Sequence, residues 1–168
     1  ERAIQGLNAA GVIYAFRRNA GIWSLEAQLM AAVPAIQSQF GRGLTFDGTT
    51  AVSCALDDTS SIFTRSSNGN WALTQTLAHG CETPQLQGDR LILNNPFADV
   101  SGSENIGQVS TYTRSGGMWQ LQTTLFGGQA GQQFGYQIAS ENNLLVVTST
   151  GPNGTLPPAQ IFRANVSG

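Results

Sequence analysis

The sequence predicts an all-β protein built from repeated units of four antiparallel strands, and three observations lead to this fold class. The three tryptophans, Trp23, Trp71 and Trp119, are spaced by 48 residues (71 − 23 and 119 − 71), and each opens a Trp-x-Leu-x-x-x-Leu pattern. Apolar and polar residues alternate in these stretches, which is the period of a half-buried strand. The 20 glycines and the Ser, Thr, Asn and Gln residues between the apolar runs suit tight turns.

Composition excludes several classes of protein. The chain has 168 residues, which is enough for one domain with a sizeable core. Only 11 % of the residues are charged and the net charge is −2, so no basic patch for nucleic acid is expected. No apolar run approaches the roughly 20 residues that a membrane span needs. No signal peptide is visible, so we expect either that one was removed or that the segment belongs to a longer chain.

The first full repeat, 10–58, follows a short apolar piece in 1–9 that resembles the last strand of an incomplete unit. β-Branched and aromatic residues, period-two alternation and an Asp47-Gly48 turn predict four strands in it. These strands are expected at 11–17, 23–29, 40–48 and 50–55.

The second and third repeats, 59–105 and 106–158, follow the same order. In the second repeat the third strand, within 82–89, carries Pro84, which removes a donor from the hydrogen-bond ladder, so an edge or irregular strand is expected there. The remaining strands are expected at 61–65, 71–77, 91–93, 107–114, 119–125, 134–142 and 144–148. Residues 159–168 begin a further unit.

Four arginines at the ends of the first strands support the register and, with the tryptophans, are interpreted as the structural anchors of the repeat. They are spaced by 48, 49 and 49 residues: Arg17, Arg65, Arg114 and Arg163. A four-stranded unit of about 40–50 residues is typical of a β-propeller blade. At 48 residues per repeat the chain would contain about 3.5 blades.

The motifs resemble those of a known family. The first repeat reads Gly11-x-x-Tyr14-x-Phe16-Arg17, then Trp23 to Leu29, then Phe40-Gly41 to Asp47-Gly48, then Ala51-Val52. This order resembles the FG-GAP repeats of integrin-alpha-like β-propellers, and it recurs over nearly the whole chain, although the middle repeat lacks the Phe-Gly pair. The resemblance implies a non-enzymatic, extracellular or cell-surface module for structure or cell adhesion. The alternatives that it leaves are a carbohydrate-binding, lectin-like propeller and an enzyme with its site in a central channel.

The number of blades implies a partner. Propellers of this family close with about seven blades, so one copy with about half that number leaves apolar end strands uncovered. Two copies forming one ring, a filament of copies and the remainder of a longer chain each place a partner against the first and last strands. The loops 31–39, 94–105 and 151–158 are the expected surfaces for a protein or glycan ligand.

Few residues suit catalysis or metal binding. His79 is the only histidine, so no zinc site with two histidines can form within one chain. His79 and Cys81 fit either a nucleophile pair or a loop histidine beside a structural cysteine. Asp57 and Asp58 fit a solvated exit loop better than a shared acid–base role, because adjacent side chains of an extended segment point to opposite sides. No cofactor is expected; the closest approach to a calcium loop, open also to interpretation as a solvated acidic loop, is Asp99, Ser101, Ser103 and Glu104.

Covalent modifications stay open at this point. Cys54 and Cys81 fit a disulfide, which would close a loop of about 27 residues and stabilise the fold by roughly 3 kcal/mol, or two buried thiols. Asn153 and Asn165 begin N-glycosylation acceptor triplets.

The tryptophans and the arginines each have two interpretations. The tryptophans fit packing between blades better than stacking on sugars, because each begins an apolar face with leucines. The arginines fit stems packed on aromatic rings, with hydrogen bonds to neighbouring carbonyls, better than a shared anion site.

Overall fold

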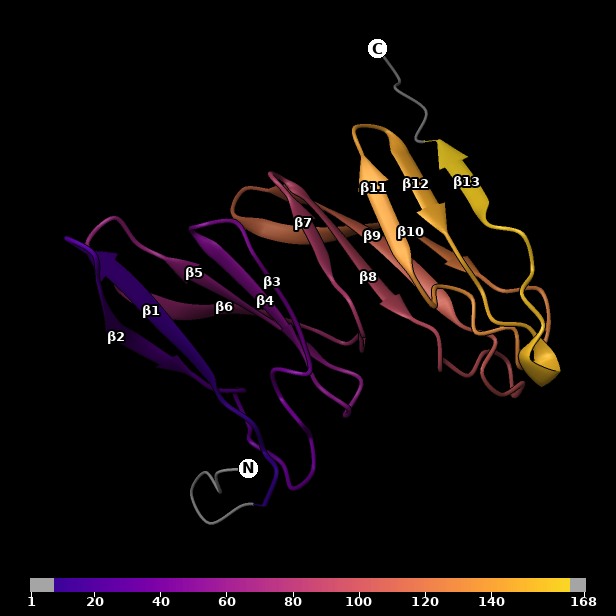
Figure 1. The fold of residues 1–168 in the computed structure, drawn as a ribbon, viewed down its shortest axis with the longest axis horizontal. Helices are drawn as coiled ribbons and strands as arrows, with labels where there is room; N and C mark the ends of the chain where they lie inside the picture. Colours follow the sequence, from indigo (N-terminus) through magenta and orange to yellow (C-terminus); the bar gives the residue numbers. More distant parts are fainter. Residues whose placement is uncertain (1–7, 164–168) are drawn as a thin grey trace. The chain divides into compact units, whose positions relative to one another are not determined.

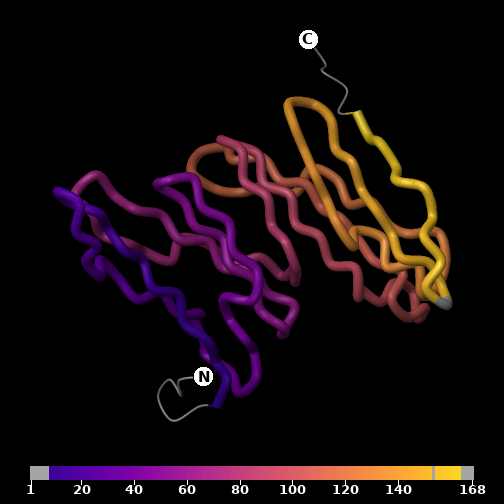
Figure 2. Tube along the Cα trace, in the orientation of Figure 1, coloured from indigo at the N-terminus to yellow at the C-terminus, as the bar shows by residue number. Residues whose placement is uncertain are grey.

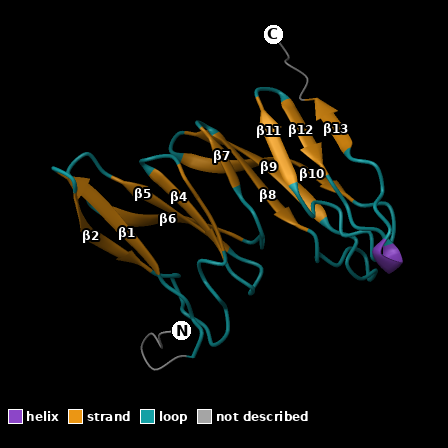
Figure 3. Ribbon diagram, viewed as in Figure 1, coloured by secondary structure: helices purple, strands orange, loops and turns teal. Residues whose placement is uncertain are grey.

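The computed structural model describes residues 8–163, apart from the side chain of Asn153. Regular structure in this range consists of β-strands and one 3-10 helix, η1 (Pro152–Gly154), as Figure 3 shows, which confirms the all-β prediction. The chain divides into two compact units, Glu1–Cys81 and Glu82–Gly168, which are described separately below. The expected partial unit at 1–9 and the end of the further unit at 159–168 lie largely outside the described residues.

The first unit contains two antiparallel sheets (Figure 1). One is the hairpin of β1 (Ile13–Asn19) and β2 (Ile22–Leu29). The other has four strands in the order β3-β4-β5-β6, with antiparallel neighbours throughout. Its strands are β3 (Gly43–Phe46), β4 (Thr50–Cys54), β5 (Ser60–Arg65) and β6 (Trp71–Leu77).

The second unit also contains two antiparallel sheets. The four-stranded sheet has the order β10-β9-β8-β7 and consists of β7 (Gln85–Gln87), β8 (Arg90–Asn95), β9 (Gln108–Ser115) and β10 (Met118–Phe126). The three-stranded sheet consists of β11 (Ile138–Glu141), β12 (Leu144–Val147) and β13 (Gln160–Arg163). The short strand β7 lies at the edge of its sheet just after Pro84, as the sequence predicted.

Each four-stranded sheet joins the last two strands of one sequence repeat to the first two strands of the next. β4 pairs with β5 through residues such as Val52 and Ile62, although these lie in different repeats. β8 pairs with β9 in the same way. The hydrogen-bonded sheets are therefore offset by two strands from the ranges 10–58, 59–105 and 106–158. Figure 2 shows the course of the chain.

Strand register corrects the alignment of the arginines. Arg65 lies across from Trp71 and Arg114 across from Trp119, but the residue across from Trp23 is Arg18. Arg17 therefore occupies the register position of Thr64 and Thr113. The aromatic positions of the first strands align instead, because Phe16, Phe63 and Tyr112 lie across from the equivalent leucines, Leu25, Leu73 and Leu121.

A β-bulge recurs at one position of the repeat. The register of the β1–β2, β5–β6 and β9–β10 pairs skips one residue of the second strand each time. The skipped residues are Glu26, Thr74 and Gln122, again spaced by 48 residues (74 − 26 and 122 − 74). A bulge turns the side chain of the extra residue away from the regular alternation, so this position can be aimed independently of the strand.

Close backbone packing explains the Gly and Phe-Gly elements of the motif. The amide of Phe40 donates to the carbonyl of Ala10 over 3.1 Å, and the amide of Phe134 donates to that of Ile106 over 3.0 Å. A Cβ on Gly11 would lie 2.0 Å from the Phe40 carbonyl oxygen, and one on Gly107 would lie 2.3 Å from that of Phe134. Only glycine fits at these two positions, both of which also have positive φ.

In the middle repeat a disulfide stands where the other repeats have the phenylalanine. The amides of Gly41, Glu82 and Gly135 donate to the equivalent carbonyls of the fourth strands, those of Cys54, Asn94 and Thr148. Cys81, one residue before Glu82, therefore takes the register position of Phe40 and Phe134. It is bonded to Cys54, with the two Cα atoms 5.2 Å apart.

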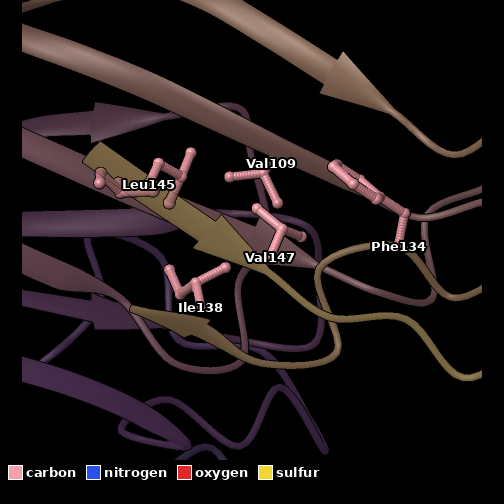
Figure 4. Packing of buried hydrophobic residues seen from close by; sticks show 6 residues of the cluster. Val109, Phe134, Ile138, Leu145 and Val147 are labelled. Carbon is pink, nitrogen blue, oxygen red and sulfur yellow. The ribbon is translucent and has the colours of Figure 1, made fainter. Parts of the chain in front are cut away.

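Two cores hold the sheets together. In the first unit Phe40 packs edge-on against Phe63 with ring centroids 6.0 Å apart, in a cluster with Leu29, Ala51 and Ala55. In the second unit Phe134 packs against Phe162 in the same arrangement. Figure 4 shows the side chains of this second cluster directed toward one another: Val109, Phe134, Ile138, Leu145 and Val147.

Candidate functional site

A cleft in the first unit brings together several of the anchors that the sequence singled out. It has a volume of about 430 Å³ and lies between the β1–β2 hairpin and the four-stranded sheet. Its lining includes aromatic rings from four strands, β1, β2, β3 and β6, and a group of charged side chains. The residues used below are Phe46, Trp71, Arg17, Glu26 and Arg65.

Glu26 is the centre of the charged group. Arg65 donates to both of its carboxylate oxygens, from Nε to Oε2 over 2.9 Å and from Nη2 to Oε1 over 2.6 Å. The indole N–H of Trp71 donates to Oε2 over 3.0 Å. Arg17 Nη1 lies 3.7 Å from Oε1. These charge-assisted hydrogen bonds link the β1–β2 hairpin to the next sheet. The side chain of Glu26 is only 16 % exposed, so the link is largely enclosed.

The bulge explains how Glu26 reaches these partners. Sequence alternation placed Glu26 on the outward polar side of its strand together with Ser24 and Gln28. The register skip at this residue instead brings its carboxylate to Arg65 and Trp71. The available sequence signal was that this repeat position carries a carboxylate only once, since Thr74 and Gln122 occupy it elsewhere.

The hydrogen bonds shift both partners' proton affinities. Hydrogen bonds donated by Arg65, the largest cause, and by Trp71, the next largest, lower the pKa of Glu26 from 4.5 to about 2. The hydrogen bond to Glu26 raises the pKa of Arg65. A carboxylate with such a low pKa is ionised near neutrality and has no proton to donate there.

Replacing Glu26 with Gln should remove a pH-dependent part of the stability. The folded pKa lies below the unfolded one, so the ionised form stabilises the fold above pH 4.5, and this contribution is lost as the pH falls toward 2. We expect the urea midpoint of the wild type to fall toward that of Glu26→Gln over this range. Parallel pH profiles of the two proteins would contradict the assignment.

Around Glu26, aromatic rings lie beside the guanidinium group of Arg17. Phe46 is exposed and its ring lies 5.8 Å from that of Trp71, centroid to centroid. The side chain of Arg17 is 55 % exposed and keeps donors available at the edge of the ion pair. The cleft thus offers flat apolar faces beside a guanidinium, which suits binding of a ligand more than acid–base chemistry.

The tryptophans differ in exposure although they share the sequence pattern. Trp119 is 5 % exposed and lies under the guanidinium of Arg114, whose Cζ is 5.3 Å from the ring centroid. Arg114 also donates from Nε to Asp89 Oδ1 over 2.7 Å. Trp71 is half-buried, whereas Trp23 is 64 % exposed. Arg163 ends β13 and is exposed.

His79 and Cys81 lie together but do not form a nucleophile pair in this structure. Cys81 is in the disulfide with Cys54 and has no thiol. His79 is buried and its Nδ1 lies 2.6 Å from the Gly80 carbonyl oxygen, to which it donates. Burial lowers the pKa of His79, while the Gly80 carbonyl and the charge of Asp58 act against this shift.

The lowered pKa predicts a loss of stability in mild acid. The unfolded chain binds a proton at His79 near pH 6.5, whereas the folded protein resists it, so stability should fall as the pH drops below 6.5. Thermal melts between pH 7.5 and 5.5 should show this decline in the wild type and a flatter profile in His79→Gln. An unchanged slope in the variant would assign the decline to other groups.

The acidic candidates lie in turns that are held by their own hydrogen bonds. Asp57 Oδ1 accepts from the amide and the hydroxyl of Thr59, over 3.2 and 2.6 Å. In the calcium candidate, Asp99 Oδ1 accepts from the Asn105 amide over 2.9 Å, and the backbones of Val100 and Ser103 bond each other. Ser101 and Glu104 are exposed in the same loop. Among residues 8–163 no group of three or more His, Cys, Asp or Glu side chains is placed to hold a metal ion.

The two glycosylation candidates lie near the C-terminal end of the sequence. Asn153 lies in η1, within the loop that was expected as a recognition surface, and Asn165 lies outside the described residues.

Over the described part of the chain no helix has the length and hydropathy to cross a membrane. No family model and no curated protein matches the chain.

Proposed function

We propose that the chain is a non-enzymatic structural and adhesion module of extracellular or cell-surface type, built from FG-GAP-like β-propeller blades. In this proposal it assembles with copies of itself or with further blades. The proposal treats each four-stranded sheet as one blade and the sheets β1–β2 and β11–β12–β13 as parts of blades; the antiparallel order of each sheet supports it.

The observation that carries the proposal is the exposure of apolar residues at repeat positions that are covered elsewhere. Phe16 is 56 % exposed, whereas Phe63, at the same register position, is 3 % exposed. Leu25 is exposed, whereas Leu73 packs against the core of the first unit. Phe63 and Leu73 are covered by residues of the preceding hairpin, Leu29 and Ile13 among them. A neighbouring sheet of the same type would cover Phe16 and Leu25 in the same way.

Several features support a structural role over an enzymatic one. Burial lowers the pKa of the histidine, both cysteines are joined, and the carboxylate of Glu26, 16 % exposed, is held by Arg65. Each of these groups is occupied in holding the fold. A disulfide also suits the oxidising surroundings of secreted and cell-surface proteins.

Light scattering of the purified chain over a range of concentrations tests the proposal. We expect a mass above the 17.7 kDa of one copy. Leu25→Lys should shift the mass toward one copy, because a charge on this face opposes its coverage. Leu156→Lys is the matched control, since Leu156 is an exposed leucine in the 151–158 loop. A mass of one copy at all concentrations, together with a cooperative melt, would rule out self-assembly.

The cleft around Glu26 favours a second function, binding of carbohydrate. Rings such as Phe46 and Trp71 offer faces for sugar stacking, and Arg17 offers donors beside them. A glycan array should show saturable binding that is lost in Phe46→Ala and Arg17→Ala. Phe126→Ala, which changes an exposed phenylalanine outside the cleft, should bind as the wild type does. Absence of saturable binding by the wild type would remove this candidate.

A further inference from the structure

The last strand, β13, reproduces the first strand of the chain. Phe16-Arg17 in β1 and Phe162-Arg163 in β13 are the two Phe-Arg dipeptides in the sequence. Register makes them equivalent: Phe162 lies across from Leu145 as Phe63 lies across from Ala51, and Phe16 shares the position of Phe63. β1 therefore has the side-chain pattern that β12 accepts from β13.

The described part of β13 is Gln160–Arg163. It forms four residue pairs with β12, from Leu144–Arg163 to Val147–Gln160. β1 has seven residues and pairs over its whole length with β2. Among residues 8–163 no strand pairs with the other edge of β1 or of β13. An open edge of this kind is a template for a strand from another chain.

A groove beside β13 resembles the Glu26 site but lacks the tryptophan and arginine donors that Glu26 has. It has a volume of about 590 Å³ and is lined by Gln122, Leu125, Phe162 and Arg163 among others. Gln122 occupies the bulge position of Glu26. Its amide nitrogen donates to the Gln120 carbonyl over 3.2 Å, and within the described residues its Oε1 accepts no hydrogen bond. In the first unit this position receives an indole N–H and a guanidinium, those of Trp71 and Arg65.

The β1–β2 hairpin carries a tryptophan and an arginine like the two donors that Gln122 lacks, Trp23 and Arg18. Trp23 lies across from Arg18, as Trp71 lies across from Arg65. Trp23 is exposed, and within the described residues its indole N–H has no acceptor. The Nε of Arg18 has only a long hydrogen bond, 3.5 Å to the Gly21 carbonyl.

We propose that copies of this chain join head to tail by strand exchange, in which β1 of a second copy pairs with β12 in place of β13. The completed sheet has the order β11-β12-β1-β2, with the last two strands from the second copy. Trp23 and Arg18 of that copy then donate to Gln122, as Trp71 and Arg65 donate to Glu26. This inference rests on the proposed self-assembly and names its interface.

The strand count agrees with this arrangement. Within residues 8–163 and without β13, strands β1 to β12 make 12 strands, enough for three sheets of four strands (12 / 4 = 3). The contact is heterologous, so it closes into a ring or continues as a filament.

Two phenylalanine variants test the exchange, measured as the dissociation constant for self-association in sedimentation experiments. Phe16→Ala should weaken association, because this ring packs in the exchanged sheet. Phe162→Ala should strengthen it, because this ring holds the competing strand β13 against Phe134. Circular dichroism confirms that both variants are folded. Effects of the same sign, or no effect of either variant, would overturn the exchange.

Two further variants test the contact at Gln122. Gln122→Glu should lower the dissociation constant about tenfold by restoring the carboxylate found at Glu26. Gln120→Glu adds the same charge to the same strand and is the control, expected to give no such gain. Trp23→Ala should weaken association by about 30-fold or more and should abolish the gain from Gln122→Glu.

The outcomes separate this inference from the proposed function. If the wild type assembles and neither Gln122→Glu nor Trp23→Ala changes its dissociation constant, the proposed assembly stands and this interface is wrong. A wild type that stays a single copy at every concentration loses both.

Discussion

Replacing Phe134 with alanine should lower the free energy of unfolding by about 3–5 kcal/mol. Phe134 is 0 % exposed and is the largest fully buried side chain in the described residues. Its ring packs edge-on against Phe162 and lies in one cluster with Val109, Leu145 and Val147. Its backbone is held against Ile106, so the loop cannot move inward to fill the space that the ring leaves. Urea unfolding followed by circular dichroism measures the change.

The control for this prediction is Phe126→Ala. Phe126 lies in the same unit, at the end of β10, and is 50 % exposed. The same substitution should lower the free energy of unfolding far less there, because the ring of Phe126 buries little apolar surface when the protein folds. Equal losses in the two variants would mean that Phe134 does not hold the second unit together.

Reduction of the disulfide should cost a similar amount, about 3–4 kcal/mol from the entropy of closing its loop. The bond joins the end of β4 to Cys81 across a sequence separation of 27 residues. Cys81 takes the place that a buried phenylalanine has in the other two repeats, so the middle repeat has no aromatic ring there to compensate for the lost link. Urea unfolding with and without a reductant measures the difference.

The double variant Cys54→Ala/Cys81→Ala separates the bond from other effects of the reductant. Its unfolding midpoint should match that of the reduced wild type and should not respond to reductant. A wild type whose midpoint is the same with and without reductant would show that the bond adds nothing to stability.

Local patterns in the sequence predicted the strands well. Alternation around Trp71 located β6, and the Asp47-Gly48 pair located the turn between β3 and β4. Pro84 correctly predicted the short edge strand β7, because a missing backbone donor acts at that one position. These features depend on neighbouring residues and on backbone chemistry, which the sequence displays directly.

The grouping of strands into sheets was not predictable in the same way. A period of 48 residues is compatible with any four consecutive strands forming a sheet, and only the pairing of Val52 with Ile62 and its neighbours selects the offset. The arginine alignment failed for a related reason. Arg17 and Arg18 are adjacent, and the choice between them depends on which residue lies across from Trp23.

The candidate site required the bulge, which leaves no mark in the alternation of the sequence. A regular strand would direct Glu26 to the side of Ser24 and Gln28. The skipped register gives its carboxylate to Arg65, 39 residues further along the chain. Contacts between sheets of this kind depend on tertiary structure, so the sequence could identify the charged residues but not their pairing.

The offset between repeat and sheet also governs how the protein can come apart. Residues 59–105 supply β5 and β6 to one four-stranded sheet and β7 and β8 to the other. This segment therefore cannot unfold on its own, since its loss would leave two half-sheets, each with one new open edge, at β4 and at β9. Amide hydrogens of both sheets should exchange with solvent through the same opening event, and partial unfolding one repeat at a time is suppressed.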